Sequence, residues 1–89
     1  MAAVRWRLSD VLEEHGITAY ALAKAGGIDR MGTVYRIARR GHEPSRIDLP
    51  TLARIVTGLR QLTGQEIQIS DILEYVFDPS EESGPVNLS

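Results

Sequence analysis

The sequence contains no cysteine, few aromatic residues and no long apolar run. The absence of cysteine excludes disulfides and thiolate metal sites. With one Trp, three Tyr and one Phe among 89 residues, the core must come from Leu, Ile, Val and Ala, which favours a helical bundle over a sandwich. No apolar run approaches the ~20 residues that cross a bilayer, and the start MAAVRWRLSD lacks the apolar core of a secretory signal, so we expect no membrane segment and a cytoplasmic location.

The chain also lacks a strong excess of either charge, with a formal net charge of -2. The charges are nevertheless segregated, because residues 17–46 are predominantly basic and residues 48–89 predominantly acidic. Such a basic region can meet a nucleic acid on one face, although ordinary solvated surface explains the same counts. The six basic residues within 17–46 are Lys24, Arg30, Arg36, Arg39, Arg40 and Arg46.

A chain of this length supports one small hydrophobic core, so we expect a single domain over residues 1–78 followed by a flexible polar tail over 79–89. The spacing of apolar residues, together with capping and glycine signals, predicts an all-α, five-helix domain. The expected helices follow Ser9 as far as His15, Thr18 as far as Gly26, the turn after Gly27 as far as Gly41, Asp48 as far as Gly64, and Ser70 through the segment ISDILEYV.

A short strand is the other element that the sequence predicts. Val4–Leu8 alternates apolar and basic residues with period two, which favours a strand. Because a lone strand leaves its backbone groups unpaired, the hypothesis is that the last helix unwinds into a strand over Tyr75–Asp78. That strand would pair with Val4–Leu8 of the same chain or of a dimer mate, which would bring Arg5 and Arg7 near Glu74 or Asp78.

The segment Ile17–Arg46 is the most informative part of the sequence. It reads as two short helices separated by the pair Gly26-Gly27, with arginines concentrated in the second helix. Val34, Ile37 and Ala38 recur at helical spacing and form an inward stripe, which leaves polar and basic residues on the other faces. This is the layout of a helix-turn-helix DNA reader.

Several segments in order make the chain resemble the Cro/CI-type, or XRE, helix-turn-helix family. They are LxxxLEEHGIT from Leu8, AYALAKAGGI from Ala19, TVYRIARRG from Thr33, IDLPTLARIV from Ile47 and ISDILEYV from Ile69. The resemblance covers roughly Arg5 to Phe77. It implies a five-helix, lambda-repressor-like domain that binds a double-stranded DNA operator as a homodimer, with the third helix in the major groove.

Two features depart from the family pattern. Six residues separate Gly27 from Val34 where the family usually has five, and Gly32 lies where the third helix would begin. A second insertion, Gln61–Gln68, lengthens the link between the fourth and fifth helices. The first departure shifts the expected contact positions by up to one residue, and the second rearranges the surface that dimers of this family would use.

Placing the third helix in the major groove assigns the candidate DNA contacts. Arg30, Met31, Thr33 and Arg36 would approach base edges, since arginine pairs with guanine and methyl groups contact thymine. A second set would hold phosphates and fix the register of the protein on the duplex. These expected phosphate contacts are Thr18, Tyr20, Tyr35, Arg39, Arg40, His42, Ser45 and Arg46.

Some of these residues also have a purely structural interpretation. Tyr35 fits packing between two helices as well as DNA contact, and Arg39 and Arg40 can simply compensate a helix C-terminus. Trp6 is interpreted as a core or dimer residue. His15 and His42 are too far apart in the sequence to suggest a metal site, so no metal and no cofactor is expected.

The leading functional hypothesis is a sequence-specific transcriptional regulator, in particular a repressor, without enzymatic activity. No arrangement of nucleophile and base, no pair of carboxylates and no phosphate-cradling glycine loop stands out in the sequence. The alternatives are an antitoxin that binds a protein partner through its acidic C-terminal half, and a helical interaction module that has lost DNA binding.

Overall fold

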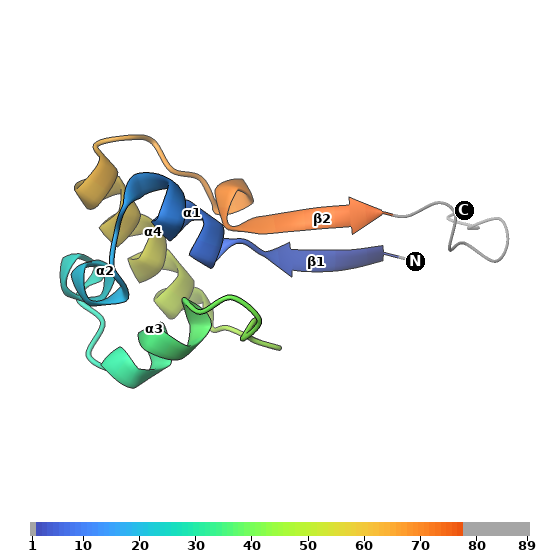
Figure 1. Cartoon of the computed structure of the whole chain (residues 1–89), viewed down its shortest axis with the longest axis horizontal. Coiled ribbons are helices and arrows are strands. Elements are labelled where there is room, and N and C mark those ends of the chain that lie inside the picture. Colours follow the sequence, from blue (N-terminus) through green and yellow to red (C-terminus); the bar gives the residue numbers. More distant parts are fainter. Residues whose placement is uncertain (1, 78–89) are drawn as a thin grey trace, which may run out of the picture.

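The computed structural model describes residues 2–77, so the expected flexible tail over 79–89 lies outside the described residues. Four α-helices form a compact body, and two strands project from it as an antiparallel ribbon (Figure 1). In chain order the elements are β1 (Ala2–Trp6), α1 (Leu8–His15), α2 (Ala19–Gly26), α3 (Met31–Ile37), α4 (Leu49–Thr63), the 3-10 turn η1 (Ile69–Asp71) and β2 (Leu73–Phe77). None of the helices within 2–77 is both long enough and apolar enough to cross a membrane.

The ends of α2 and α4 and the C-terminal end of α1 lie where the sequence predicted them, whereas α1 begins at Leu8, with Arg7 rather than Ser9 as its N-cap. Gly16, Gly27 and Gly64 follow the three helices in the left-handed conformation that terminates a helix, with φ of 65°, 66° and 68°. Thr18 caps α2, because its hydroxyl oxygen accepts a hydrogen bond from the Ala21 amide at 3.0 Å. These signals are confirmed because each depends on residues within one helical turn.

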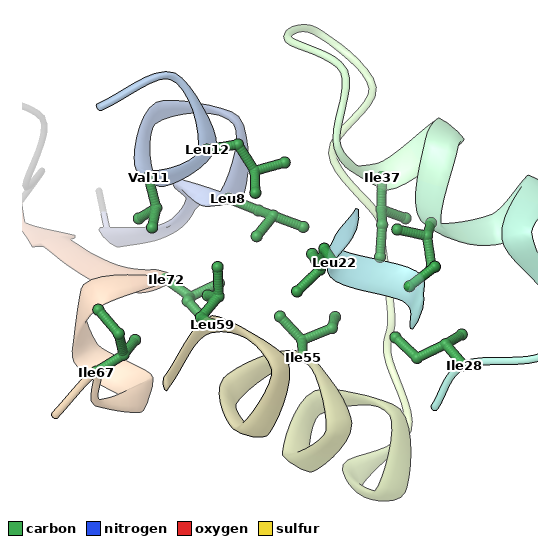
Figure 2. Close-up of a cluster of buried hydrophobic side chains, with 12 residues drawn as sticks. Leu8, Val11, Leu12, Leu22, Ile28, Ile37, Ile55, Leu59, Ile67 and Ile72 are labelled. Atoms are coloured by element: carbon green, nitrogen blue, oxygen red, sulfur yellow. The ribbon is translucent and has the colours of Figure 1, made fainter. Parts of the chain in front are cut away.

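One hydrophobic core lies between the helices (Figure 2). Every helix contributes from its apolar stripe, and η1 closes one end of the core through the residue that follows it. Burying an aliphatic side chain of this kind stabilises a protein by about 1.5–3 kcal/mol. The side chains with almost no exposed surface are Leu8, Leu22, Val34, Ile55, Leu59 and Ile72.

Helices α2 and α4 cross in direct backbone contact at two glycines. A Cβ atom on Gly58 would lie 2.9 Å from the Gly26 nitrogen and 3.0 Å from a methyl group of Leu22. A Cβ atom on Gly26 would lie 2.5 Å from the Arg54 carbonyl oxygen. Because Gly26 and Gly58 have no side chains, α4 can approach α2 of the helix-turn-helix this closely.

The ribbon confirms that an N-terminal strand pairs within the same chain, but this strand is Ala2–Trp6 rather than the predicted Val4–Leu8, because Leu8 begins α1. The register places Arg5 opposite Glu74, and the guanidinium nitrogen Nη1 lies 3.6 Å from the carboxylate of Glu74. Arg7 instead lies 3.6 Å from the carboxylate of Asp10, in the first turn of α1. Asp78, the other expected partner of the two arginines, lies outside the described residues.

The expectation of a fifth helix over ISDILEYV is wrong. Residues Ile69–Asp71 form only a 3-10 turn, and Leu73–Phe77 is a strand that starts earlier than the predicted Tyr75. Ile72 keeps its expected place in the core, whereas Ile69 is exposed. The residues after Ile72 include Tyr, Val and Phe, which favour strands, and β1 lies alongside them and pairs with their backbone groups. The fold is therefore four helices and a strand pair rather than an all-α, five-helix domain.

Helix α3 is also shorter than predicted, since it ends at Ile37 rather than near Gly41. The indole nitrogen of Trp6 donates a hydrogen bond to the Ile37 carbonyl oxygen at 2.7 Å. In a longer helix that carbonyl would accept from the amide four residues later. Trp6 thus satisfies the helix end from the ribbon side, and the chain turns away through Gly41, which has φ of 85°.

Candidate nucleic-acid interface

The candidate interface is built on α2 and α3, which pack against each other across a short turn (Figure 1). Gly27 ends α2 in a left-handed conformation, and α3 begins four residues later at Met31. Val34 and Ile37 face the core, so the remaining faces of this short helix carry its polar and basic side chains outward. The extra residue before Val34 is accommodated with Arg30 as the N-cap of α3 and Gly32 in its first turn.

The four predicted base-contacting residues fall into two groups. Arg30 and Arg36 are exposed, and Thr33 is half-buried beside both of them along α3. Met31 is half-buried and packs against the hydrophobic core, so less of its side chain faces outward. The structure thus presents two arginines and a threonine along the outer side of α3.

Two surface hollows flank this part of α3. One has a volume of about 480 Å³ and lies between α3 and the loop that leads to α4; its lining includes Thr33, Arg36, His42, Ser45 and Arg46. The other has a volume of about 580 Å³ and is lined by Arg30, Thr33, Thr51 and Arg54 among others. Both hollows share Thr33, Asp48 and Thr51, so they adjoin each other between α3 and the start of α4.

The N-terminal end of α2 lies on the other flank of the helix-turn-helix. Thr18 is exposed, and since its oxygen accepts from Ala21, its hydroxyl hydrogen remains free to donate. Tyr20 is exposed, and the Lys24 ammonium lies 5.5 Å from the centroid of its ring. This end of α2 therefore offers a hydroxyl donor, a phenol and a cation together.

Tyr35 does not pack between α3 and α4. Its side chain is 45% exposed, and it lines a shallow hollow with Thr18, Arg39 and Arg40. Arg39 is exposed just beyond the end of α3. Because Tyr35 is this exposed, it is not a packing residue between two helices, and its side chain is accessible to a ligand.

Arg40 differs from the other arginines of this region because two carboxylates of α1 hold it. Its guanidinium group lies 3.1 Å from Asp10 and forms a hydrogen-bonded ion pair with Glu13. The hydrogen bond and charge of Glu13, followed by the charge of Asp10, raise the pKa of Arg40. Because this pKa is raised, the ion pairs of Arg40 stabilise the fold fully at any pH below the usual guanidinium pKa. Their stabilisation is lost only when the pH rises through the raised pKa, so Arg40 stays charged in ordinary buffers.

The remaining arginines of the interface are not neutralised in this way. No carboxylate among residues 2–77 lies within ion-pair distance of Arg30, Arg36, Arg39 or Arg46. Acidic side chains are nevertheless present at the edges of the hollows, namely Asp29, Glu43 and Asp48. The exposed guanidinium groups are thus available to an anionic ligand, within a surface whose edges carry some negative charge.

A model of the Cro/C1-type HTH DNA-binding domain matches residues 7–78 of the sequence. The chain belongs to this family. The match covers the helix-turn-helix, all four helices and the whole of β2, and the family is typically non-enzymatic. Searches of curated proteins and of solved structures gave no significant match. Family membership therefore makes the chain a DNA-binding domain with the character of a regulator.

Sequence reasoning missed three residues that this Cro/C1-type domain places at the interface. Thr51 and Arg54 lie in the first two turns of α4 and border the hollow beside Arg30, and Lys24 lies over Tyr20. Arg54 also donates a hydrogen bond to the Gly27 carbonyl oxygen at 2.9 Å, which joins α4 to the turn between α2 and α3. Helical spacing could have indicated Arg54, because it stands between the buried Leu52 and Ile55 and must point elsewhere.

Proposed function

We propose that this protein binds a specific sequence of double-stranded DNA through α3 and represses transcription from the site that it occupies. The observation that carries the proposal is the outer side of α3, where Arg30, Thr33 and Arg36 are accessible and no described carboxylate pairs with either arginine. An α-helix fits the major groove of B-form DNA, and base edges there are distinguishable by their hydrogen-bonding groups.

In this arrangement α3 reads the sequence. Arg30 and Arg36 donate to guanine O6 and N7, and the Thr33 methyl group contacts a thymine methyl group. Met31 supports α3 from the core side and offers its exposed part to a neighbouring base. Arg54 keeps the turn before α3 in place through its bond to Gly27.

The surrounding residues hold the DNA backbone. The free hydroxyl hydrogen of Thr18 donates to a phosphate oxygen, with Tyr20 and Lys24 beside it. On the other flank, the loop between α3 and α4 follows the adjacent strand. The proposed phosphate contacts of that flank are His42, Ser45 and Arg46. Tyr35 and Arg39, with Arg40 at the edge, are proposed phosphate contacts on the same side as Thr18. Contacts of this kind fix register without reading sequence.

Repression requires no catalytic group, because a protein that occupies its site excludes other proteins from the same stretch of DNA. A homodimer would read two half-sites related by a two-fold axis, so that the operator is palindromic.

Selection from random-sequence duplex DNA with the purified chain at low salt tests the proposal. We expect an enriched motif, and binding to it weakened in Arg36→Ala by about 1–3 kcal/mol, as for an arginine that contacts a base. Arg40→Ala is the matched comparison, and its loss of affinity is expected to be smaller because Asp10 and Glu13 already hold this guanidinium group. The absence of any enriched motif would contradict the proposal.

A further inference from the structure

The two-stranded ribbon has one face made of aliphatic and aromatic side chains, none of them charged. Residues that are directly opposite in the register share a face, and successive residues alternate between faces. One face therefore carries Trp6 with Leu73, Val4 with Tyr75, and Ala2 with Phe77. The reverse face carries the remaining pairs, Arg5 with Glu74 and Ala3 with Val76.

The outer part of this apolar face is uncovered within the described chain. Val4, Tyr75 and Phe77 are 64%, 67% and 47% exposed, although Val and aromatic side chains gain most from burial. Only the inner end is covered, where Trp6 is half-buried against the end of α3. Figure 1 shows why: the ribbon extends away from the helices, so no helix packs against its outer half. Contiguous exposed apolar surface of this kind marks an interaction site.

We infer that this face is where a second copy of the chain packs, with the two ribbons stacked about a two-fold axis. Charge argues for an identical partner. The face carries no charged side chain, and Arg5 and Glu74 on the reverse face compensate each other at 3.6 Å. Two copies of the face therefore meet without like-charge repulsion, as a self-complementary two-fold contact requires.

The area of the face sets how strong the contact is. A fully exposed aromatic side chain presents roughly 150–250 Å², so Val4, Tyr75 and Phe77 together leave roughly 300 Å² uncovered per copy. A standard stable interface takes about 800 Å² from each partner. The dimer is therefore weak in free solution, and, if the proposed function holds, two adjacent half-sites on DNA complete it by raising the local concentration of the partner.

The ribbon is also coupled to the proposed reading helix. Trp6 belongs to the apolar face and donates to the last carbonyl of α3. A partner that packs on Val4 and Tyr75 thus lies against a rigid connection to α3. Stacking two ribbons therefore fixes the distance and direction between the two copies of α3, which is what a fixed half-site spacing requires.

Sedimentation equilibrium of the full chain without DNA, from micromolar to millimolar concentration, tests the inference. We expect a concentration-dependent monomer and dimer. Val4→Lys places a charge on the apolar face and should raise the dissociation constant of the dimer on the order of tenfold or more, because two lysines would then face each other. Ala3→Lys is the matched control: it adds the same charge to the next residue of β1, also exposed but on the reverse face, and should leave dimerisation unchanged.

Three results would overturn the inference. They are a monomer at every concentration, a dimer that Val4→Lys does not weaken, and a dimer that Ala3→Lys weakens equally. The first would also be seen if the chain beyond Phe77 covered the face instead. Binding of Val4→Lys and Ala3→Lys to a single half-site separates this result from the proposed function. Equal affinity of both variants for one half-site, together with a lost dimer in Val4→Lys alone, supports both proposals, whereas a dimer without any selected DNA motif refutes only the function.

Discussion

Trp6 is the residue that connects the two parts of the molecule. Its ring is half-buried at the base of the ribbon, and its indole nitrogen donates to the Ile37 carbonyl oxygen at 2.7 Å across 31 residues of sequence. The bond ends α3 and anchors β1 to it in one step. The sequence interpretation of Trp6 as a core or dimer residue is confirmed as to the core, since the side chain packs against the hydrophobic cluster.

Replacing Trp6 by Phe tests this connection. The variant leaves the Ile37 carbonyl without its donor, so the free energy of unfolding should fall by about 1–3 kcal/mol, the cost of an unsatisfied polar group, with a further loss from the smaller ring. Urea denaturation measures this fall. Tyr35→Phe is the control, because it removes a hydroxyl from an exposed side chain and should change stability little. Equal stability of Trp6→Phe and the parent protein would show that the bond does not anchor the helix.

Arginines that the sequence alone does not distinguish have different partners in the structure. Arg39 and Arg40 are adjacent, yet Arg40 pairs with Asp10 and Glu13 of α1, whereas no carboxylate within residues 2–77 holds Arg39. Arg54 acts on the backbone of Gly27. These differences depend on which distant residue each side chain reaches, so the spacing of arginines alone could not reveal them.

At the scale of elements, the contact between α2 and α4 controls the position of the helix-turn-helix. In the sequence Gly58 is only a weak helix former within a long helix. In the structure it lies against the Gly26 backbone, and the two helices touch where neither has a side chain. The glycine therefore contributes packing that its helix propensity does not reveal.

Two glycine substitutions with opposite expected effects test this contact. Gly58→Ala forces a Cβ atom to 2.9 Å from the Gly26 nitrogen and should destabilise the protein by about 1–3 kcal/mol through overpacking. Gly32→Ala, in the first turn of α3, meets nothing within 4 Å at a backbone angle that alanine accepts, and should stabilise it by about 0.5–1 kcal/mol. Thermal unfolding of both variants gives the comparison. A destabilised Gly32→Ala or a neutral Gly58→Ala would contradict the packing described.

At the scale of the whole molecule, positive charge collects on the helix-turn-helix side, although the net charge of the chain is -2. The exposed arginines of residues 17–46 surround the outer side of α3 and the following loop. The ribbon adds little to this charge, since Arg5 is paired with Glu74. A protein of this kind can attract DNA to one side while its overall charge limits unselective binding.

The salt dependence of DNA binding tests this charge distribution. The logarithm of the association constant should fall linearly with the logarithm of the salt concentration, with a slope of about -0.9 for each phosphate contacted. Arg46→Ala should make that slope shallower by about one phosphate contact. Arg5→Ala removes the same charge from the ribbon and should leave the slope unchanged. Identical slopes for all three proteins would show that the loop before α4 does not hold phosphate.

The sequence by itself determined the features that residues within one turn of each other encode. Thr18, Gly27 and Gly64 set the ends of helices because caps and left-handed turns are local. The period-two pattern predicted a strand near the N-terminus for the same reason, although the strand is Ala2–Trp6 and not Val4–Leu8. The helix-turn-helix and its family followed from such local signals in their order.

Only the tertiary structure decided which of two locally acceptable conformations each remaining segment takes. Leu73–Phe77 has residues at helical spacing but becomes a strand because β1 lies beside it, and α3 ends at Ile37 because Trp6 reaches that carbonyl. In both places the deciding hydrogen-bond partner is distant in the sequence. A hydrogen bond to a distant residue stabilises the segment only once the chain has folded, so no pattern of neighbouring residues could predict it.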